Sequence, residues 1–262
     1  NKLLDHENVR ALLLFLLSLG IFLLFWEMGA KLKWFAKGMP TASLTITELW
    51  YWVTHPFYDN GPNDLGIGWN LLISLRRVAI GYTLASVIAV PLGILVGISQ
   101  VAFKAFNPYF QLLKPESPLA WLPLGLYLFR DSELTGIFII TIASIWPTLT
   151  NTAFGVANVD SSYLDVSKTL GASRWRTIFK VIIPAALPNI ISGLRISMGI
   201  SWLVIVAAEM LLGTGLGYFI WNEWNNLYIP NILVAIFIIG IVGIVLDQIF
   251  AYLEKLVSFG KS

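Results

Sequence analysis

Charged side chains within apolar stretches are the residues of this sequence best suited to chemistry. Lys114 and Glu116 lie in the apolar stretch 108–129, which prolines interrupt three times after residue 114. A proline within a helix disrupts its backbone hydrogen bonds, so free polar backbone groups are expected beside both charges. Because an ammonium group and free N–H donors suit an anion, we expect both residues on a path for anions. The alternative for Lys114 is a side chain that extends to the inner membrane surface.

Other charged residues in apolar stretches are candidates for the same path or for ion pairs between helices. An ionisable group at the centre of a spanning helix costs about 2.5–3.5 kcal/mol on insertion scales. Arg195 begins one such stretch, and its alternative role is an interface anchor or an ion pair linking helices. For Glu209, beside Met210, the alternative is a structural ion pair or a gate hydrogen bond. The candidate path residues are Lys114, Glu116, Trp121, Arg195, Glu209 and Met210.

The sequence lacks the residue groupings of the common enzyme classes. It has no cysteine, two scattered histidines, no HExxH and no Walker A motif. The GTGLG at 213–217 has Tyr218 where a dinucleotide-binding motif needs its last glycine, so we interpret it as a turn. We therefore expect a chain that is not an enzyme, holds no metal or cofactor and binds no nucleic acid.

The composition predicts helices that cross a membrane. The 262 residues are 57% hydrophobic and 12% charged, and the mean hydropathy is +0.75. Soluble domains carry about 25% charged residues. Apolar runs of about 20 residues, without the alternation of a barrel strand, are typical of an all-α polytopic membrane protein.

Six apolar stretches are long enough to span the bilayer, and we place them at 11–26, 70–98, 108–129, 134–156, 194–212 and 231–257. We divide the chain into two domains. Residues 1–69 contain one span and an external connection, and residues 70–262 form a core of five spans. In the connection, 43–53 is predicted to form a short interfacial helix. Gly93 and Gly97 form a GxxxG that permits close helix approach, for which we expect packing within the chain, with a dimer seam as the alternative.

A basic amphipathic segment, 160–192, separates the fourth and fifth predicted spans. Six crossings place it on the same side as both termini, and its Lys and Arg residues make that side cytoplasmic. Gly171 is predicted to break its helix in two, and Pro184 and Pro188 to end it. One interpretation is a helix that lies on the inner leaflet against anionic lipid. The other is a docking surface for a soluble partner.

The spacing within this segment resembles the EAA loop of ABC importer permeases. That loop reads Glu-Ala-Ala, three residues, Gly, nine residues, Ile-x-Leu-Pro. Here Gly171 and Pro184 match, Asp165 stands in place of the Glu, and Val181-x-Ile183 precedes the proline. The wider chain is similar to permeases for nitrate, bicarbonate, sulfonates and taurine, most of all the cyanobacterial nitrate and bicarbonate permeases. The stretches that carry this similarity are 74–82, 117–129, 146–156, 171–196 and 207–225.

The resemblance implies the permease subunit of an ATP-driven importer with the type I permease fold, in a bacterial inner membrane, that of a cyanobacterium being one case. It implies a small oxyanion as substrate, nitrate or nitrite first, bicarbonate next, and an organosulfonate or taurine after these. The implied partners are a second copy of the chain, two cytoplasmic ATPases that carry ATP and Mg²⁺, and an extracytoplasmic binding protein. The residues implied in ATPase coupling are Asp165, Gly171, Ala172, Ser173, Arg174, Trp175 and Pro184.

A different class of function is a stand-alone channel or an ion-coupled carrier. Such a protein predicts a well-populated relay of charges within the membrane and needs no cytoplasmic docking element. The sequence shows the reverse pattern, with few intramembrane charges and one long basic cytoplasmic segment.

Overall fold

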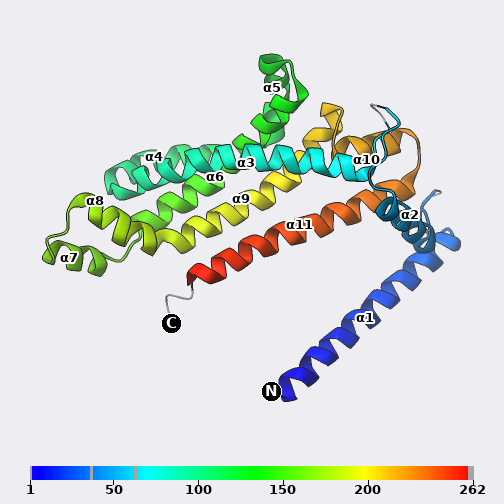
Figure 1. Cartoon of the computed structure of the whole chain (residues 1–262), viewed down its shortest axis with the longest axis horizontal. Coiled ribbons are helices and arrows are strands. Elements are labelled where there is room, and N and C mark those ends of the chain that lie inside the picture. Colours follow the sequence, from blue (N-terminus) through cyan, green and yellow to red (C-terminus); the bar gives the residue numbers. More distant parts are fainter. Residues whose placement is uncertain (1, 36–37, 62–63, 259–262) are drawn as a thin grey trace. The chain divides into compact units, whose positions relative to one another are not determined.

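The computed structural model describes residues 2–35, 38–61 and 64–258, which form helices joined by loops and one isolated β-bridge. Within the described residues, five helices are long and apolar enough to cross a membrane. The predicted all-α membrane fold is therefore confirmed. The elements in chain order are α1 (Lys2–Lys31), α2 (Ala42–Thr54), α3 (Ile67–Ile98), α4 (Gln100–Leu113), η1 (Pro118–Trp121), α5 (Leu122–Phe129), α6 (Ser132–Ala157), α7 (Ser161–Thr169), α8 (Arg174–Thr177), η2 (Ile178–Ile182), α9 (Ile183–Leu212), α10 (Leu216–Asn225) and α11 (Ile229–Ser258) (Figure 1).

The stretch predicted as the third span, 108–129, is not one helix. Helix α4 begins earlier than expected, because the Ser99 side chain accepts a hydrogen bond from Ala102 N and caps it. Residues 100–107, which lie between the second and third predicted spans, are therefore helical. The helix then ends at Leu113, and the chain resumes as η1 and α5 after a turn that contains Pro115. The prolines thus break the crossing into two helical parts, as their missing N–H groups require.

One compact unit comprises Asn1–Gly68 and Ile220–Ile238. In it, Trp26 Nε1 of α1 donates to the Pro40 carbonyl at 3.0 Å, and Ser43 N at the start of α2 donates to Glu27 at 3.0 Å. Trp52 of α2 donates through Nε1 to Asn231 Oδ1 at 2.8 Å. The predicted helix at 43–53 is present as α2, and it packs within its unit through this buried tryptophan.

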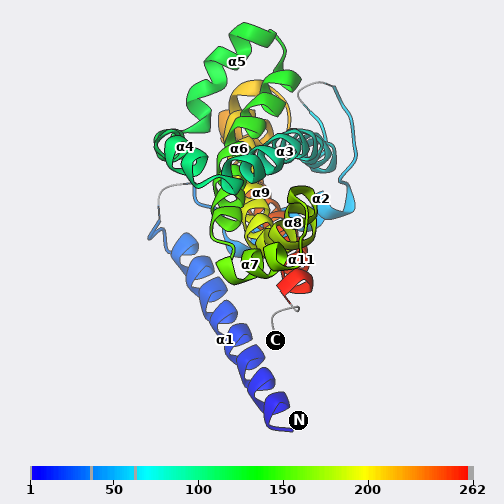
Figure 2. The ribbon, with the colours of Figure 1, turned by 90° about the vertical axis from the view of Figure 1, so that its left-hand side faces the viewer.

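The second unit, Trp69–Phe219 with Ile239–Ser262, is a bundle in which α3, α4, α6 and α9 run side by side (Figures 1 and 2). Helix α3 places small residues at every fourth position, 81, 85, 89, 93 and 97, against α6. A Cβ at Gly93 would lie 2.6 Å from Thr152 Cβ, and one at Gly97 would lie 2.6 Å from Val156 Cβ. The predicted close packing of these glycines within the chain is confirmed.

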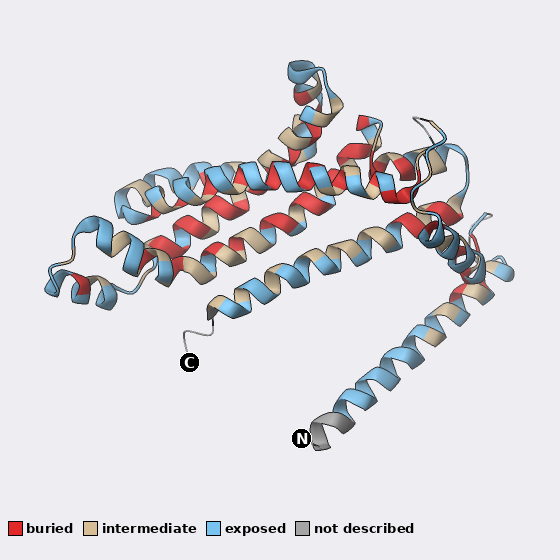
Figure 3. Ribbon diagram, viewed as in Figure 1, coloured by how far each residue is buried: buried red, intermediate tan, exposed pale blue. Residues whose placement is uncertain are grey.

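The core of this unit lies between α6 and α9, whose facing sides are buried (Figure 3). Small and polar residues alternate along the seam, which lets the two backbones approach closely. Ser144 and Ser201 share a hydrogen bond, and Thr148 Oγ1 donates to Ser197 Oγ at 2.9 Å. Each of these hydroxyls is fully buried, so the seam satisfies its own polar groups away from lipid.

Candidate functional site

The first part of the basic segment folds as an elbow, which we define as residues 160–182. Helix α7 begins at Asp160, whose Oδ1 accepts a hydrogen bond from Ser162 N at 2.8 Å. This hydrogen bond holds the pKa of the Asp160 carboxyl below its usual range. The Ser167 and Thr177 hydroxyls lie 2.7 Å apart and tie α7 to α8. The elbow is therefore a defined structure with its own cap and internal hydrogen bond.

Gly171 ends α7 as the sequence predicts. Its φ is +66°, a left-handed conformation that glycine adopts without the steric penalty of a side chain. Gly171 N donates to the Lys168 carbonyl at 2.9 Å, and Ala172 N donates to the Ser167 carbonyl at 3.0 Å. These two hydrogen bonds define a Schellman motif. The predicted break at Gly171 is confirmed, and its cause is the closure of a helix end.

The prediction that Pro184 and Pro188 end the amphipathic helix is wrong. Ser173 caps α8, and the chain then continues through the π turn η2 into α9 without a break. Pro184 lies in the first turn of α9, after a π turn that changes the hydrogen-bond register around it. Residues Arg174–Leu212 therefore form one continuous apolar segment that connects the elbow to the bundle.

Apolar side chains on the elbow are exposed, which is unusual for a segment that carries so many charges. Leu170 is 78% exposed, Trp175 72% and Val166 58%. The Trp175 and Phe179 rings stack with centroids 6.0 Å apart. Asp165 forms an exposed ion pair with Lys168 at 3.0 Å, and Arg174 is also exposed. The elbow thus presents an apolar and basic surface, which fits both interpretations drawn from the sequence, a docking segment and a helix on the inner leaflet.

Three of the six candidate path residues lie together in one small cavity. Lys114, Glu116 and Trp121 line a space of about 70 Å³ with residues of α6 and with Ile200 of α9. Trp121 Nε1 donates to Glu116 Oε2 at 3.3 Å. Lys114 caps the end of α4, and helical rise places it roughly 21 Å from Gln100 at the start of that helix.

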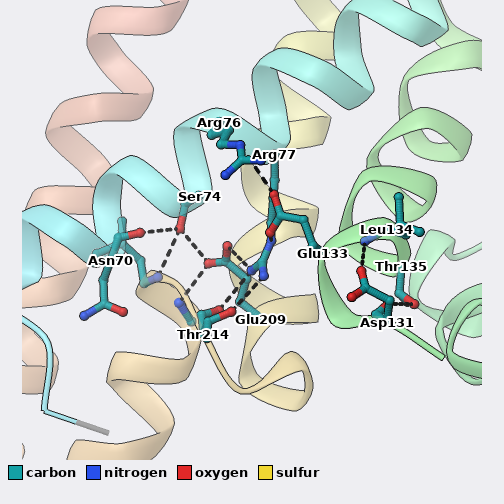
Figure 4. Close-up of polar contacts among 12 residues, drawn as sticks. Asn70, Ser74, Arg76, Arg77, Asp131, Glu133, Leu134, Thr135, Glu209 and Thr214 are labelled. Atoms are coloured by element: carbon teal, nitrogen blue, oxygen red, sulfur yellow. Dashed lines mark hydrogen bonds and ion pairs between the residues drawn. The ribbon is translucent and has the colours of Figure 1, made fainter. Parts of the chain in front are cut away.

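Glu209 lies elsewhere, at the centre of a buried polar network (Figure 4). Its Oε1 accepts from Arg77 Nη1 at 3.0 Å, and its Oε2 accepts from the Ser74 hydroxyl at 2.6 Å. Arg77 also donates through Nε to Glu133 Oε2 at 2.9 Å and through Nη2 to Thr214 Oγ1 at 2.7 Å. The network joins α3, α6 and α9. The structural ion pair given as the alternative role of Glu209 is therefore present.

The turn at 213–217 folds around this network, as expected for a turn and not for a nucleotide-binding loop. Gly215 has φ +97°, and a Cβ there would lie 2.2 Å from the Glu209 carboxylate carbon. A Cβ at Gly217 would lie 1.9 Å from the Val206 carbonyl oxygen. Gly217 N donates to Glu209 Oε2 at 3.2 Å. The glycines therefore let the backbone approach the buried carboxylate.

Arg195 pairs with two carboxylates of α11. Its Nε and Nη2 contact both oxygens of Asp247 at 2.8 Å, and its Nη1 contacts Glu254 Oε2 at 3.0 Å. The ion pair between helices given as its alternative role is present. Met210, the last candidate, is half-buried beside Glu209. Arg195, Glu209 and Met210 therefore do not join Lys114 in its cavity.

Sequence reasoning missed several polar residues that the fold makes important. Arg77 is not among the candidates drawn from the sequence, yet only 2% of its side chain is exposed. Asn107 and Gln111 are also absent from those candidates, yet with Lys114 they form a polar stripe along α4 and its end. Their spacing of four and three residues was the signal available in the sequence.

Comparison with known proteins identifies the family of the chain. The family described as "Binding-protein-dependent transport system inner membrane component" matches residues 89–259. The nitrate import permease protein NrtB of Synechocystis sp. is 40% identical over 92% of this chain and 87% of its own length. The bicarbonate transport system permease protein CmpB of the same organism is 41% identical over 92% and 86%.

Solved structures show the same fold at low sequence identity. An inward-facing MetNI methionine ABC transporter matches 71% of this chain and 93% of its own chain, with a TM-score of 0.62 and 13% identity. An amino acid ABC transporter matches 82% and 96%, with a TM-score of 0.59 and 16% identity. The chain belongs to the family of binding-protein-dependent inner membrane components: it is a multi-pass permease subunit of an ABC importer and not itself an ATPase.

Proposed function

We propose that this permease imports a small oxyanion, with nitrate as the first candidate and bicarbonate as the second. The observation that carries the proposal is the similarity to NrtB and CmpB, which are equally close at 40% and 41% identity. The cavity at Lys114 agrees with it. Its volume of about 70 Å³ is far below the roughly 300–1,000 Å³ of pockets for drug-sized ligands.

The elbow is the proposed contact with the motor of the transporter. In this proposal two copies of the chain form the path, and each elbow docks on one of two cytoplasmic ATPases that bind ATP and Mg²⁺. An extracytoplasmic binding protein delivers the anion. The exposed Leu170 and Trp175, flanked by Arg174, supply the apolar and basic contacts. The Schellman turn at Gly171 fixes α7 relative to α8, so closure of the ATPases moves the elbow as a rigid body.

The direct test is transport by the complete importer in proteoliposomes. The permease is reconstituted with its ATPases and its binding protein, and uptake of labelled nitrate and labelled bicarbonate is measured with and without ATP. We expect ATP-dependent uptake of one of these anions, abolished when the binding protein is omitted. An importer that hydrolyses ATP in response to its loaded binding protein but accumulates neither anion would contradict the proposal.

A further inference from the structure

A second cavity lies next to the one at Lys114, between α4 and α6. Its volume is about 310 Å³, and Lys114 lines both spaces. The small cavity includes residues that follow Lys114 in the chain, up to Trp121. The larger cavity includes residues that precede it on α4, from Phe103 onward. Lys114 therefore lies at the boundary between two neighbouring cavities, one lined by α4 and the other by the residues that follow α4.

The larger cavity is lined by amide side chains, which is an unusual composition for a membrane-spanning region. On α4, Asn107 lies two turns and Gln111 one turn before Lys114, and Asn151 of α6 lines the same cavity. Polar residues within spanning segments are costly to bury and occur mainly where they bind or conduct something. The aromatic residues Phe103, Phe110 and Phe154 complete the lining.

These side chains offer hydrogen-bond donors suited to an oxyanion. The Lys114 ammonium has three N–H groups, and each amide has two. Asn151 donates one N–H to the Pro147 carbonyl at 2.8 Å, which leaves its second N–H available. Among the described residues that line this cavity, none is a carboxylate. The site thus has one positive charge and several neutral donors, and nothing of like charge to repel an anion.

We propose that Lys114, Asn107, Gln111 and Asn151 form a transient binding site where the oxyanion pauses as it crosses the permease. The proposal rests on the proposed function as an oxyanion importer and adds to it the residues that hold the substrate. A single cation among neutral amides favours entry of a monovalent anion without trapping it, which is what conduction requires.

The test compares charge removal at Lys114 with the same change at Lys104. Lys104 lies on the same helix, is exposed and does not line either cavity. In proteoliposomes that contain the complete importer, the readout is nitrate or bicarbonate moved per ATP hydrolysed. We expect Lys114→Gln to lower this ratio by about tenfold, the change that loss of 1.4 kcal/mol produces. We expect Lys114→Arg to retain most of it, and Lys104→Gln to match the wild type.

Gln111→Met provides a second variant if Lys114→Gln fails to assemble. It keeps the size and flexibility of the side chain but removes both N–H donors, and we expect it to lower the ratio about two- to fivefold. A wild-type ratio in every assembled Lys114 and Gln111 variant would overturn the proposal while leaving the oxyanion function intact. Absence of nitrate and bicarbonate uptake in the wild-type importer would instead contradict the function itself.

Discussion

Arg77 and Glu209 form a buried ion pair that joins α3 to α9 across 132 residues of sequence. The Arg77 Nη1 and Glu209 Oε1 atoms are 3.0 Å apart, and 2% and 0% of the two side chains are exposed. The hydroxyl of Ser74 and the backbone of the 213–217 turn complete the coordination of the carboxylate. Because the pair is fully hydrogen-bonded, it holds three helices together and leaves no charge free for the substrate.

Replacing Arg77 should therefore destabilise the permease strongly. Loss of one partner of a buried ion pair costs about 3–5 kcal/mol, because the remaining charge is left uncompensated. We expect Arg77→Met to lower the thermal unfolding temperature of the detergent-solubilised protein clearly. The neighbouring Arg76 is the matched control, since 71% of its side chain is exposed and its contact with Glu133 is long, at 3.8 Å. An equal drop in unfolding temperature for Arg77→Met and Arg76→Met would refute a special role for the buried pair.

The glycines of the 213–217 turn offer a graded test of the same network. Gly213 has φ +80° with open space at its Cβ position, whereas a Cβ at Gly215 would meet the Glu209 carboxylate. Gly213→Ala should lower the free energy of unfolding by about 1–2 kcal/mol, which is the cost of the left-handed backbone conformation for a residue with a side chain. We expect Gly215→Ala to unfold at a lower temperature than Gly213→Ala, because it adds a steric clash to the same penalty. The reverse order would show that the packing around Glu209 is not as described.

Gly171 is expected to matter for coupling more than for stability of the bundle. Its φ of +66° disfavours side chains, but its Cβ position is open, so substitution strains only the turn. We expect Gly171→Val to reduce ATP-driven uptake, and Gly171→Asn to retain more of it, because Asn tolerates this conformation. Gly240→Val, in open space on α11, is the control for added bulk. Normal ATP-driven uptake by Gly171→Val would show that coupling does not depend on the conformation of the elbow.

Arg195 is expected to act as a link between α9 and α11. About a third of its side chain is exposed, so each ion pair contributes less than a buried one. A double-mutant cycle with Arg195→Leu and Asp247→Leu measures the pair alone. We expect a favourable coupling energy in thermal unfolding, with the anion moved per ATP changed less than in Lys114→Gln. Additive stability effects together with altered anion preference would place Arg195 on the path instead.

The spans and the elbow could be predicted because each depends on local sequence. Apolar runs of sufficient length identify crossing helices whatever their neighbours are. A glycine between two amphipathic turns likewise predicts a helix end. Gly171 ends α7 because its own backbone adopts a left-handed conformation. The π turn before Pro184 was not predictable in this way, because tertiary packing decides whether a helix accommodates a proline or ends at it.

The partners of the charged residues could not be predicted, since they depend on how the helices are aligned. Glu209 was recognisable as an intramembrane charge, but Arg77 becomes its partner only through the register of α3 against α9. The same applies to Asn107 and Asn151, which come together only when α4 packs beside α6. The early start of α4 likewise depends on the Ser99 cap, and it brings Asn107 and Gln111 onto the same helix that Lys114 ends.

The most direct test of the account asks whether the elbow faces the cytoplasm and is covered by the ATPase. The sequence has no cysteine, so Leu170→Cys introduces a single thiol at a position that is 78% exposed in this chain. Tyr127→Cys, 74% exposed on α5, serves as the control for labelling from the opposite side. We predict that a membrane-impermeant maleimide labels Cys at 170 only from the cytoplasmic side, and that assembly with the ATPases protects it. Labelling from the periplasm, or equal labelling with and without the ATPases, would contradict the account.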